Sequence, residues 1–232
     1  MTAAGEHSLR DVPLLTSMAP HSREAVERQC RWRNFKSDEQ IIDRQSTNRD
    51  VYFVTRGKAQ VVMYSLSGRE ITFDDLKAGG LFGELAALDG QPRSANVVAL
   101  EDTTVAIMSP DTFNRLLSDH PDIAQQLMVR MAEVIRTSTD RIMDLSTLGA
   151  NNRVYGELLS LCKPRLRNDN TARIKPIPTH GDIASRVSMT RETVARVLSD
   201  LARAGLVLRE PTELLITDVA RLTHMVEEFR GH

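Results

Sequence analysis

The apolar residues of this 232-residue chain follow a strand-like pattern between residues 32 and 109. Short apolar runs are separated there by turn residues, such as Arg56-Gly57 and Ser67-Gly68. Several short strands at this spacing are typical of an antiparallel sandwich or roll. The strands that we expect lie at residues 51–55, 59–64, 70–73, 96–100 and 103–108.

The segments on either side of this region follow a helical pattern. Two short helices are expected at residues 11–18 and 22–30, and Pro20 separates them. Ser109 can cap a third helix, because its side chain can accept a hydrogen bond from the first turn. Pro110 suits the first helical position, where no amide hydrogen is needed.

A long helix is expected next, at residues 122–148, and spans roughly 40 Å at 1.5 Å per residue. Apolar and small residues recur along it at alternating intervals of three and four, namely at Met128, Met131, Ile135, Ser138, Ile142 and Leu145. This is the seam of a coiled coil, so we expect two copies of the chain to pair along residues 124–145. The alternative is that the stripe packs on its own domain.

The chain is expected to belong to the α+β class and to divide into three parts. A β-roll domain is predicted at residues 1–120, and a dimerisation helix with a hinge at 121–149. Gly149 marks the hinge because glycine weakens a helix. A winged helix-turn-helix domain is predicted at residues 150–232, with an extra amphipathic helix at 218–230 whose role the sequence leaves open.

Composition narrows the classes of protein. The chain is 41% apolar and 26% charged and has no run of 18 apolar residues, as expected for a globular protein without a membrane span. The N-terminus lacks a basic region followed by an apolar one, and the two cysteines fit a reduced compartment, so we expect a cytoplasmic protein. Cys30 and Cys162 are too far apart in sequence for a metal-site spacing, and no metal is expected.

The net charge of −1 hides an uneven distribution. Residues 1–150 hold 17 Lys and Arg against 21 Asp and Glu, and residues 210–232 hold 2 against 5. Residues 151–209 instead hold 11 against 5, a net charge of +6. This basic block is where an anionic polymer would bind.

The stretch Gly79–Ala95 has the chemistry of a pocket for a phosphate ester. Its glycines let the backbone turn tightly, and a short helix starting near Gly83 would present free amides to an anion. Arg93 offers a guanidinium that matches phosphate oxygens, and Ser94 adds a neutral donor. Glu84 would repel a phosphate but can accept a hydrogen bond from a sugar hydroxyl. A phosphate beside a free sugar hydroxyl suggests a nucleotide.

Residues 179–198 predict a helix-turn-helix. Thr179 and Thr190 can cap its two helices, and Ser188-Met189 forms the turn. Arginine can bind guanine O6 and N7 together, and glutamate can accept from cytosine N4, so the outward face can read a half-site containing G·C pairs. The residues expected to contact DNA, through bases or phosphates, are Thr179, His180, Thr190, Arg191, Glu192, Thr193 and Arg196.

The Gly79–Ala95 stretch resembles the phosphate-binding cassette of cyclic-nucleotide-binding domains. In that family the glutamate binds the ribose 2′-hydroxyl and the arginine binds the cyclic phosphate, which implies these roles for Glu84 and Arg93. The residues around them at matching positions are Gly83, Leu85, Ser94 and Ala95. Two hydroxyl residues of the long helix contact the purine in the family, one of them from the other subunit, and Ser138 and Thr139 match that pair. The alternative for these hydroxyls is a bond back to the helix backbone.

The run Arg191-Glu192-Thr193-Val194-Ala195-Arg196 resembles the recognition helix of CRP/FNR regulators, and within them that of the catabolite activator branch. The resemblance implies a homodimer that binds a palindromic TGTGA-like site, contacts RNA polymerase and responds to cAMP or cGMP. Between these two nucleotides the sequence does not decide, since hydroxyls both donate and accept. The family's arginine one turn before the hydroxyl pair is Val134 here. Glu210 and Glu213 make the predicted wing (205–209 and 213–216) acidic, which argues against a phosphate contact there.

Three alternatives remain at this stage. A redox or gas sensor could use the same fold, although the chain has no N-terminal cysteine cluster. A regulator could also work constitutively, without a ligand. We find no convergent acid, base and nucleophile, so an enzyme is not expected. Target genes and the choice between activation and repression are open.

Overall fold

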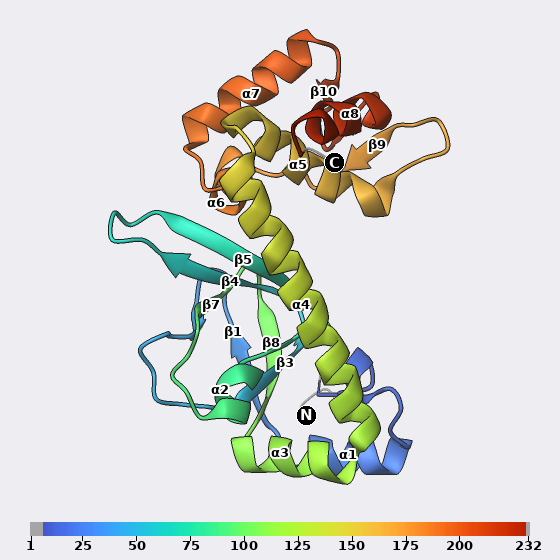
Figure 1. The fold of residues 1–232 in the computed structure, drawn as a ribbon. Helices are drawn as coiled ribbons and strands as arrows, with labels where there is room; N and C mark the ends of the chain where they lie inside the picture. The colour runs from blue at the N-terminus through green and yellow to red at the C-terminus, as the bar shows by residue number, and fades with distance from the viewer. Residues whose placement is uncertain (1–6, 231–232) are drawn as a thin grey trace. The chain divides into compact units, whose positions relative to one another are not determined.

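The computed structural model describes residues 7–230, with side chains to residue 227 (Figure 1). The chain divides into two compact units between Glu133 and Val134. Each unit has its own hydrophobic core. None of the helices in the described part is long and apolar enough to cross a membrane.

The N-terminal unit contains two antiparallel four-stranded sheets. The first has the strand order β1-β8-β3-β6, and its strands are β1 (Arg31–Phe35), β8 (Thr103–Met108), β3 (Val51–Arg56) and β6 (Leu81–Phe82). The second has the order β2-β7-β4-β5, and its strands are β2 (Gln40–Ile42), β7 (Asn96–Ala99), β4 (Lys58–Tyr64) and β5 (Glu70–Lys77). These sheets form the predicted β-roll.

Along the chain, helices come before, within and after the strands of the roll. A 3-10 turn, η1 (Pro13–Leu15), and α1 (Pro20–Glu27) precede the strands. α2 (Glu84–Asp89) comes between β6 and β7 in the sequence. α3 (Pro110–Asp119) and the long α4 (Pro121–Thr147) follow the strands. The Ser109 hydroxyl accepts from the Thr112 amide and Pro110 is the first residue of α3, which confirms the predicted start.

Three details of the sequence prediction are wrong. The helix expected at residues 11–18 is only the 3-10 turn η1, Pro13–Leu15. Pro20 does not separate two helices: it is the first residue of α1, where proline's preset φ suits the first turn and its missing amide hydrogen costs nothing. β5 continues to Lys77, beyond the expected end at residue 73, because pairing with β4 extends the strand. Gln60 of β4 donates to the Asp75 carboxylate at 3.0 Å across that pair.

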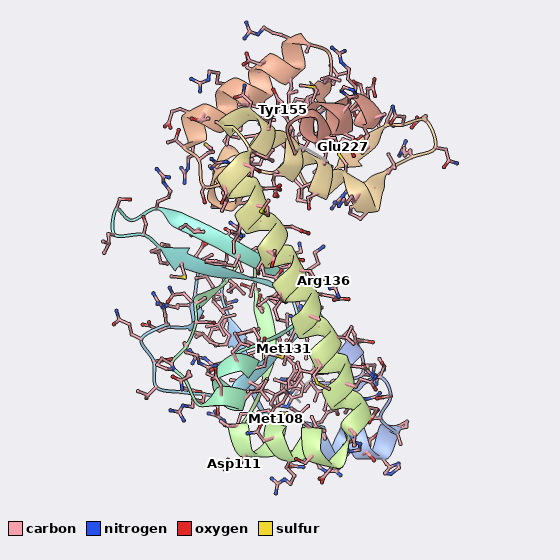
Figure 2. The ribbon with its side chains drawn as sticks, viewed as in Figure 1. Met108, Asp111, Met131, Arg136, Tyr155 and Glu227 are labelled. Atoms are coloured by element: carbon pink, nitrogen blue, oxygen red, sulfur yellow. The ribbon has the colours of Figure 1, made fainter. Side chains whose placement is uncertain are left out.

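The roll encloses two clusters of buried side chains. One, which includes Phe35, Val54 and Val105, fills the space between the sheets. The other lies under the helices and contains Met108, at the end of β8, with Met131 of α4 packed against it (Figure 2). Met131 therefore faces its own domain, which is the alternative considered for the stripe, whereas Met128 and Ile135 of the same stripe are exposed.

The C-terminal unit is a winged helix-turn-helix. It begins with the rest of α4, after which Gly149 is the N-cap residue of α5 (Ala150–Cys162). The remaining elements are η2 (Lys163–Arg165), β9 (Ala172–Ile174), α6 (His180–Val187), α7 (Arg191–Arg203), β10 (Val207–Arg209), β11 (Leu214–Ile216) and α8 (Val219–Arg230). The strands form one antiparallel sheet of order β10-β11-β9.

The extra helix at the end of the chain is α8, which packs against α5 (Figure 1). Its Leu222 and Val226 are buried in one core with Val154 and Leu158 of α5. Tyr155 joins the same core, whereas Glu227 lies on the exposed side of α8 (Figure 2). The helix thus completes the core of the C-terminal unit.

Candidate functional site

The cassette begins with a turn that only glycine fits. Gly83 has a φ of 83°, in the left-handed region, and it caps α2. A Cβ added there would lie 2.7 Å from Nη1 of Arg93 and 2.8 Å from the carbonyl oxygen of Asp50. Any side chain would therefore displace the arginine, so the glycine both makes the turn and leaves space for the guanidinium.

Arg93 is held in a cradle of oxygen atoms. Its Nη1 donates to the Gly83 carbonyl at 2.9 Å. Its Nη2 donates to the Asp50 carbonyl at 2.8 Å and to Oδ1 of Asn48 at 3.2 Å. The guanidinium also lies over the Tyr52 ring, with Cζ 5.8 Å from the ring centroid. These contacts immobilise a side chain that is only 5% exposed.

One donor of this arginine has no acceptor. Among the described buried side chains, Nε of Arg93 is the polar atom without a hydrogen-bond partner. Burial lowers the pKa of Arg93, while the neighbouring acidic groups Asp50 and Glu84 oppose that shift. A buried donor without an acceptor costs roughly 1–3 kcal/mol, which an incoming anion would recover.

Glu84 is the first residue of α2 and is partly buried. Burial raises the pKa of its carboxyl group, and its own helix amide, Arg130 and Arg93 act in the opposite direction. Arg130 of α4 is fixed nearby, because its guanidinium donates to the Leu81 carbonyl at 2.9 Å. The carboxylate and Arg93 thus influence each other electrostatically, as a site for a hydroxyl beside a phosphate requires.

The other cassette residues predicted from sequence lie on the same segment. Leu85 is 41% exposed on α2, Ser94 is exposed, and Ala95 is half-buried beside the start of β7. Sequence reasoning missed Asn48, Asp50 and Tyr52, which contact the Arg93 guanidinium. They come from the loop before β3 and from β3 itself, and no local pattern in the sequence marks them.

Ser138 and Thr139 both lie exposed on α4. The Thr139 hydroxyl donates to the Ile135 carbonyl at 3.0 Å. This is the backbone bond that we considered as the alternative, and it leaves the oxygen's lone pairs available as acceptors. A base would therefore have to donate to Thr139 or displace that bond.

The helix-turn-helix is set by three local interactions. The Thr179 hydroxyl accepts from the Asp182 amide at 3.1 Å, and the Asp182 carboxylate accepts from the Thr179 amide at 2.8 Å, which makes a capping box. Ser188 ends α6 with φ 54° and ψ 45°, a left-handed turn. The Thr190 hydroxyl then caps α7 by accepting from the Thr193 amide at 3.2 Å. The predicted caps and turn are confirmed.

The face expected to read DNA is exposed. Val194, Val197 and Leu201 are buried in the core of the unit, so the opposite side of α7 faces out. Most of the predicted contact residues are exposed and Thr193 is half-buried; the exposed ones are Thr179, His180, Thr190, Arg191, Glu192 and Arg196. The helix amides and Thr190 lower the pKa of Glu192, which keeps it charged as a hydrogen-bond acceptor.

Comparison with known proteins matches both units. The profile of the cyclic nucleotide-binding domain matches residues 32–120, and that of the Crp-like helix-turn-helix domain matches residues 152–225. The CRP-like cAMP-activated global transcriptional regulator of Mycobacterium tuberculosis is 28% identical over 173 residues, which cover 74% of this chain and 77% of that protein. The cyclic AMP receptor protein of Thermus thermophilus is 29% identical over 214 residues, 92% of this chain and 96% of that protein. The chain belongs to the CRP/FNR family.

The fold of this CRP/FNR protein matches solved structures over nearly the whole chain. The structure of a CooA mutant from Carboxydothermus hydrogenoformans superposes with a TM-score of 0.80 at 20% sequence identity, over 95% of this chain and 96% of that one. The chain is thus a DNA-binding transcription regulator with a cyclic nucleotide-binding domain. The curated relatives from Mycobacterium tuberculosis and Escherichia coli are named as global transcriptional regulators, which agrees with the expectation of a regulator and not an enzyme.

The wing of this CRP/FNR protein has its acidic residues paired. Arg173 of β9 donates to the Glu210 carboxylate at 2.8 Å and also contacts Glu213. β9 pairs with β11 in the sheet, so Arg173 lies on the strand next to the wing and close to its two carboxylates. The pairing explains how two glutamates are tolerated at this position.

Proposed function

We propose that this protein is a cyclic-nucleotide-gated transcription regulator. The observation that carries the proposal is Arg93, a buried guanidinium with three acceptors in place and one donor, Nε, without a partner. A cyclic phosphate supplies an anionic acceptor of the kind that such a donor needs. Glu84 would accept the ribose 2′-hydroxyl, and Gly83, Leu85, Ser94 and Ala95 complete the cassette.

The base would be recognised by Ser138 and Thr139, as the family resemblance implies. Both hydroxyls can donate and accept, so they suit adenine N6 or guanine O6. The relatives from M. tuberculosis and T. thermophilus are named for cAMP, and their similarity favours cAMP as the effector of this chain. cGMP is the alternative.

The active form would be a homodimer paired along α4. Three apolar side chains spaced seven residues apart on this helix are exposed, namely Met128 (62%), Ile135 (65%) and Ile142 (64%). Pairing of two copies would bury this stripe in a coiled coil. Two recognition helices about 34 Å apart would then read a palindromic, TGTGA-like site. Contact with RNA polymerase, a cytoplasmic location and the division at residues 1–120, 121–149 and 150–232 belong to the same proposal.

A thiol-based redox sensor is the less favoured reading. Both cysteines are free. Burial raises the pKa of Cys30 to about 12 and that of Cys162 to about 11. Because the thiolate is the reactive form, both groups are poor redox sensors at neutral pH.

Calorimetric titration of the full-length chain with cAMP and cGMP tests the ligand. We expect saturable binding of one or both, and loss of that binding in Arg93→Ala. Arg69→Ala is the matched control, because Arg69 is an exposed arginine of the same unit at the turn between β4 and β5. Binding retained by Arg93→Ala would refute the phosphate role of this arginine.

Gel shifts with and without the nucleotide test the gating. We expect DNA affinity to rise when the bound nucleotide is present. Equal affinity in both conditions would indicate a constitutive regulator and remove the gating claim. An absorbance spectrum of the purified protein addresses the remaining rival, since a visible band would indicate a haem or iron–sulfur sensor.

A further inference from the structure

Gly181 lies in the first turn of α6, two residues after the cap Thr179. It contacts the side chain of Arg191, the first residue of α7. A Cβ added at Gly181 would lie 3.2 Å from Nε of Arg191 and 3.5 Å from its Cζ and Nη2. The guanidinium therefore lies against the backbone of the preceding helix, and a Cβ at residue 181 would push it away by a few tenths of an ångström.

This contact differs from those of three other described glycines, and also from that of Gly80, whose added Cβ would meet the backbone carbonyl of Lys77 at 2.8 Å and not a side chain. Gly57, Gly79 and Gly83 have φ values of 85°, 89° and 83°, which alone favour glycine. Gly181 is not among the residues with positive φ, and it lies within a regular helix. Its backbone would accept alanine, so the conformation of α6 does not require glycine there.

The neighbouring groups on α7 are also held before any DNA is bound. The Thr190 hydroxyl caps the helix, and hydrogen bonds from the helix amide and Thr190 hold the Glu192 carboxylate. Arg191 extends from the same turn but lies over Gly181 instead. The two charged groups at the start of α7 therefore lie in different places: Glu192 interacts with Thr190, and Arg191 occupies space that the absence of a side chain at residue 181 leaves open.

We infer that Gly181 is a specificity-determining residue of the DNA-reading face, because it leaves the space in which the Arg191 guanidinium lies. The inference rests on the proposed base-reading role of Arg191. Bidentate recognition of guanine needs two hydrogen bonds at once, and each is sensitive to displacements of a few tenths of an ångström. Gly181 is a positioning residue, which acts on the base through Arg191.

The test uses the full-length chain and duplexes selected from a randomised library in the presence of cAMP. Relative affinities are then measured for the selected site and for each of its single-base-pair variants. We expect Arg191→Ala to lower discrimination at one base pair by roughly 5- to 150-fold. Gly181→Ala is expected to lower discrimination at the same base pair by about threefold to tenfold, because one of two hydrogen bonds weakens.

Two comparisons separate positioning from other effects. In the Arg191→Ala background, Gly181→Ala should cause no further loss, since its effect passes through the arginine. Gly156→Ala is the control for helix propensity, because Gly156 lies within α5 and a Cβ there meets no atom within 4 Å. It should leave discrimination unchanged.

Three outcomes would overturn the inference. The first is that Gly181→Ala discriminates between base pairs as well as the wild type does. The second is an equal loss of affinity at every base pair, which indicates a phosphate contact. The third is that Gly181→Ala still lowers discrimination in the Arg191→Ala background. If the wild-type chain selects no site with or without cAMP, the proposed function itself fails. If the chain selects a site that Arg191→Ala reads equally well, only the role of Arg191 and the inference built on it fail.

Discussion

The guanidinium of Arg141 donates to the backbone carbonyl of Arg186 at 2.7 Å. Arg141 is on α4, and Arg186 is the next-to-last residue of α6, so the bond ties the long helix to the first helix of the helix-turn-helix. Glu157 of α5 lies 3.6 Å from Nε of Arg186 and counters the charge of both arginines. Burial lowers the pKa of Arg141, and Glu157 opposes that shift.

We expect Arg141→Met to loosen the end of α6. The substitution removes the donor to a partly buried carbonyl and leaves the Glu157–Arg186 pair, a loss of about 1–3 kcal/mol in local stability. Hydrogen exchange of the α6 amides measures this directly and should speed up by about 5- to 150-fold. Arg136→Met is the matched control, since Arg136 is an exposed arginine on the same helix (Figure 2). Unchanged hydrogen exchange in Arg141→Met would show that the Arg141–Arg186 hydrogen bond does not stabilise α6.

Glu84→Gln should stabilise the N-terminal unit at neutral pH while weakening nucleotide binding. The pKa of Glu84 is raised above its ordinary value of 4.5 by burial, so the folded state holds the ionised carboxylate at a cost. That cost is fully present when the pH is above the raised pKa and disappears as the pH falls below the ordinary value of 4.5, where the carboxyl group is protonated in both the folded and the unfolded state. The advantage of the glutamine variant should therefore be largest at pH 7 and vanish in acid.

Urea unfolding followed by Trp32 fluorescence measures the stability of the N-terminal unit, which contains Glu84. Trp32 is the single tryptophan of the chain and lies in β1, packed against the core under the helices. A glutamine variant that is less stable than the wild type at pH 7, or whose advantage grows in acid, would show that burial does not dominate at Glu84.

Ile135→Glu with Ile142→Glu should dissociate the proposed dimer. Each isoleucine is exposed in the single chain, and burial against a partner would stabilise pairing by roughly 1.5–3 kcal/mol per side chain. Two charges placed in each of two facing helices should raise the dimer dissociation constant by at least about 100-fold. Sedimentation equilibrium measures it, and Arg136→Glu, off the stripe, is the control. An unchanged dimer would place the interface elsewhere.

Gly57→Ala should destabilise the roll far more than Gly68→Ala. Both glycines have φ in the left-handed region, 85° and 75°. A Cβ at Gly57 would lie 2.5 Å from the Asp102 carbonyl oxygen, whereas one at Gly68 meets nothing within 4 Å. Gly68→Ala therefore tests backbone strain alone, about 1 kcal/mol. Gly57→Ala adds a clash with backbone atoms and should cost about 3 kcal/mol or more by Trp32 fluorescence in urea. Similar losses in the two variants would mean that the turn at Gly57 relaxes.

The parts of the fold that the sequence predicted are those with local signals. The cap at Ser109, the capping residue Thr179 and the break at Gly149 each act through neighbours within four residues, and each is where the sequence indicates. The β6 strand, Leu81–Phe82, could not be found in this way. Its two residues form a strand only because they pair with Tyr52 and Phe53 of β3.

In the candidate site, too, the sequence predicts what depends on local signals and misses what depends on long-range contacts. Glu84 and Arg93 stand nine residues apart in one cassette, and their residue types suggest a phosphate ester. Asn48 and Asp50, which hold the arginine, come from a loop more than forty residues earlier. Their role depends on the roll that brings two distant segments together, and no sequence pattern reports such a contact.

The cradle around Arg93 also has a consequence for timing. A guanidinium that is already fixed by Gly83, Asn48 and Asp50 has little rotamer freedom left to lose when an anion arrives. Capture of the anion then requires no slow rearrangement of this side chain, so its rate is close to that of encounter. The duration of a signal is set by how long the ligand stays, and changes in affinity among variants of the cassette should appear mainly in the dissociation rate.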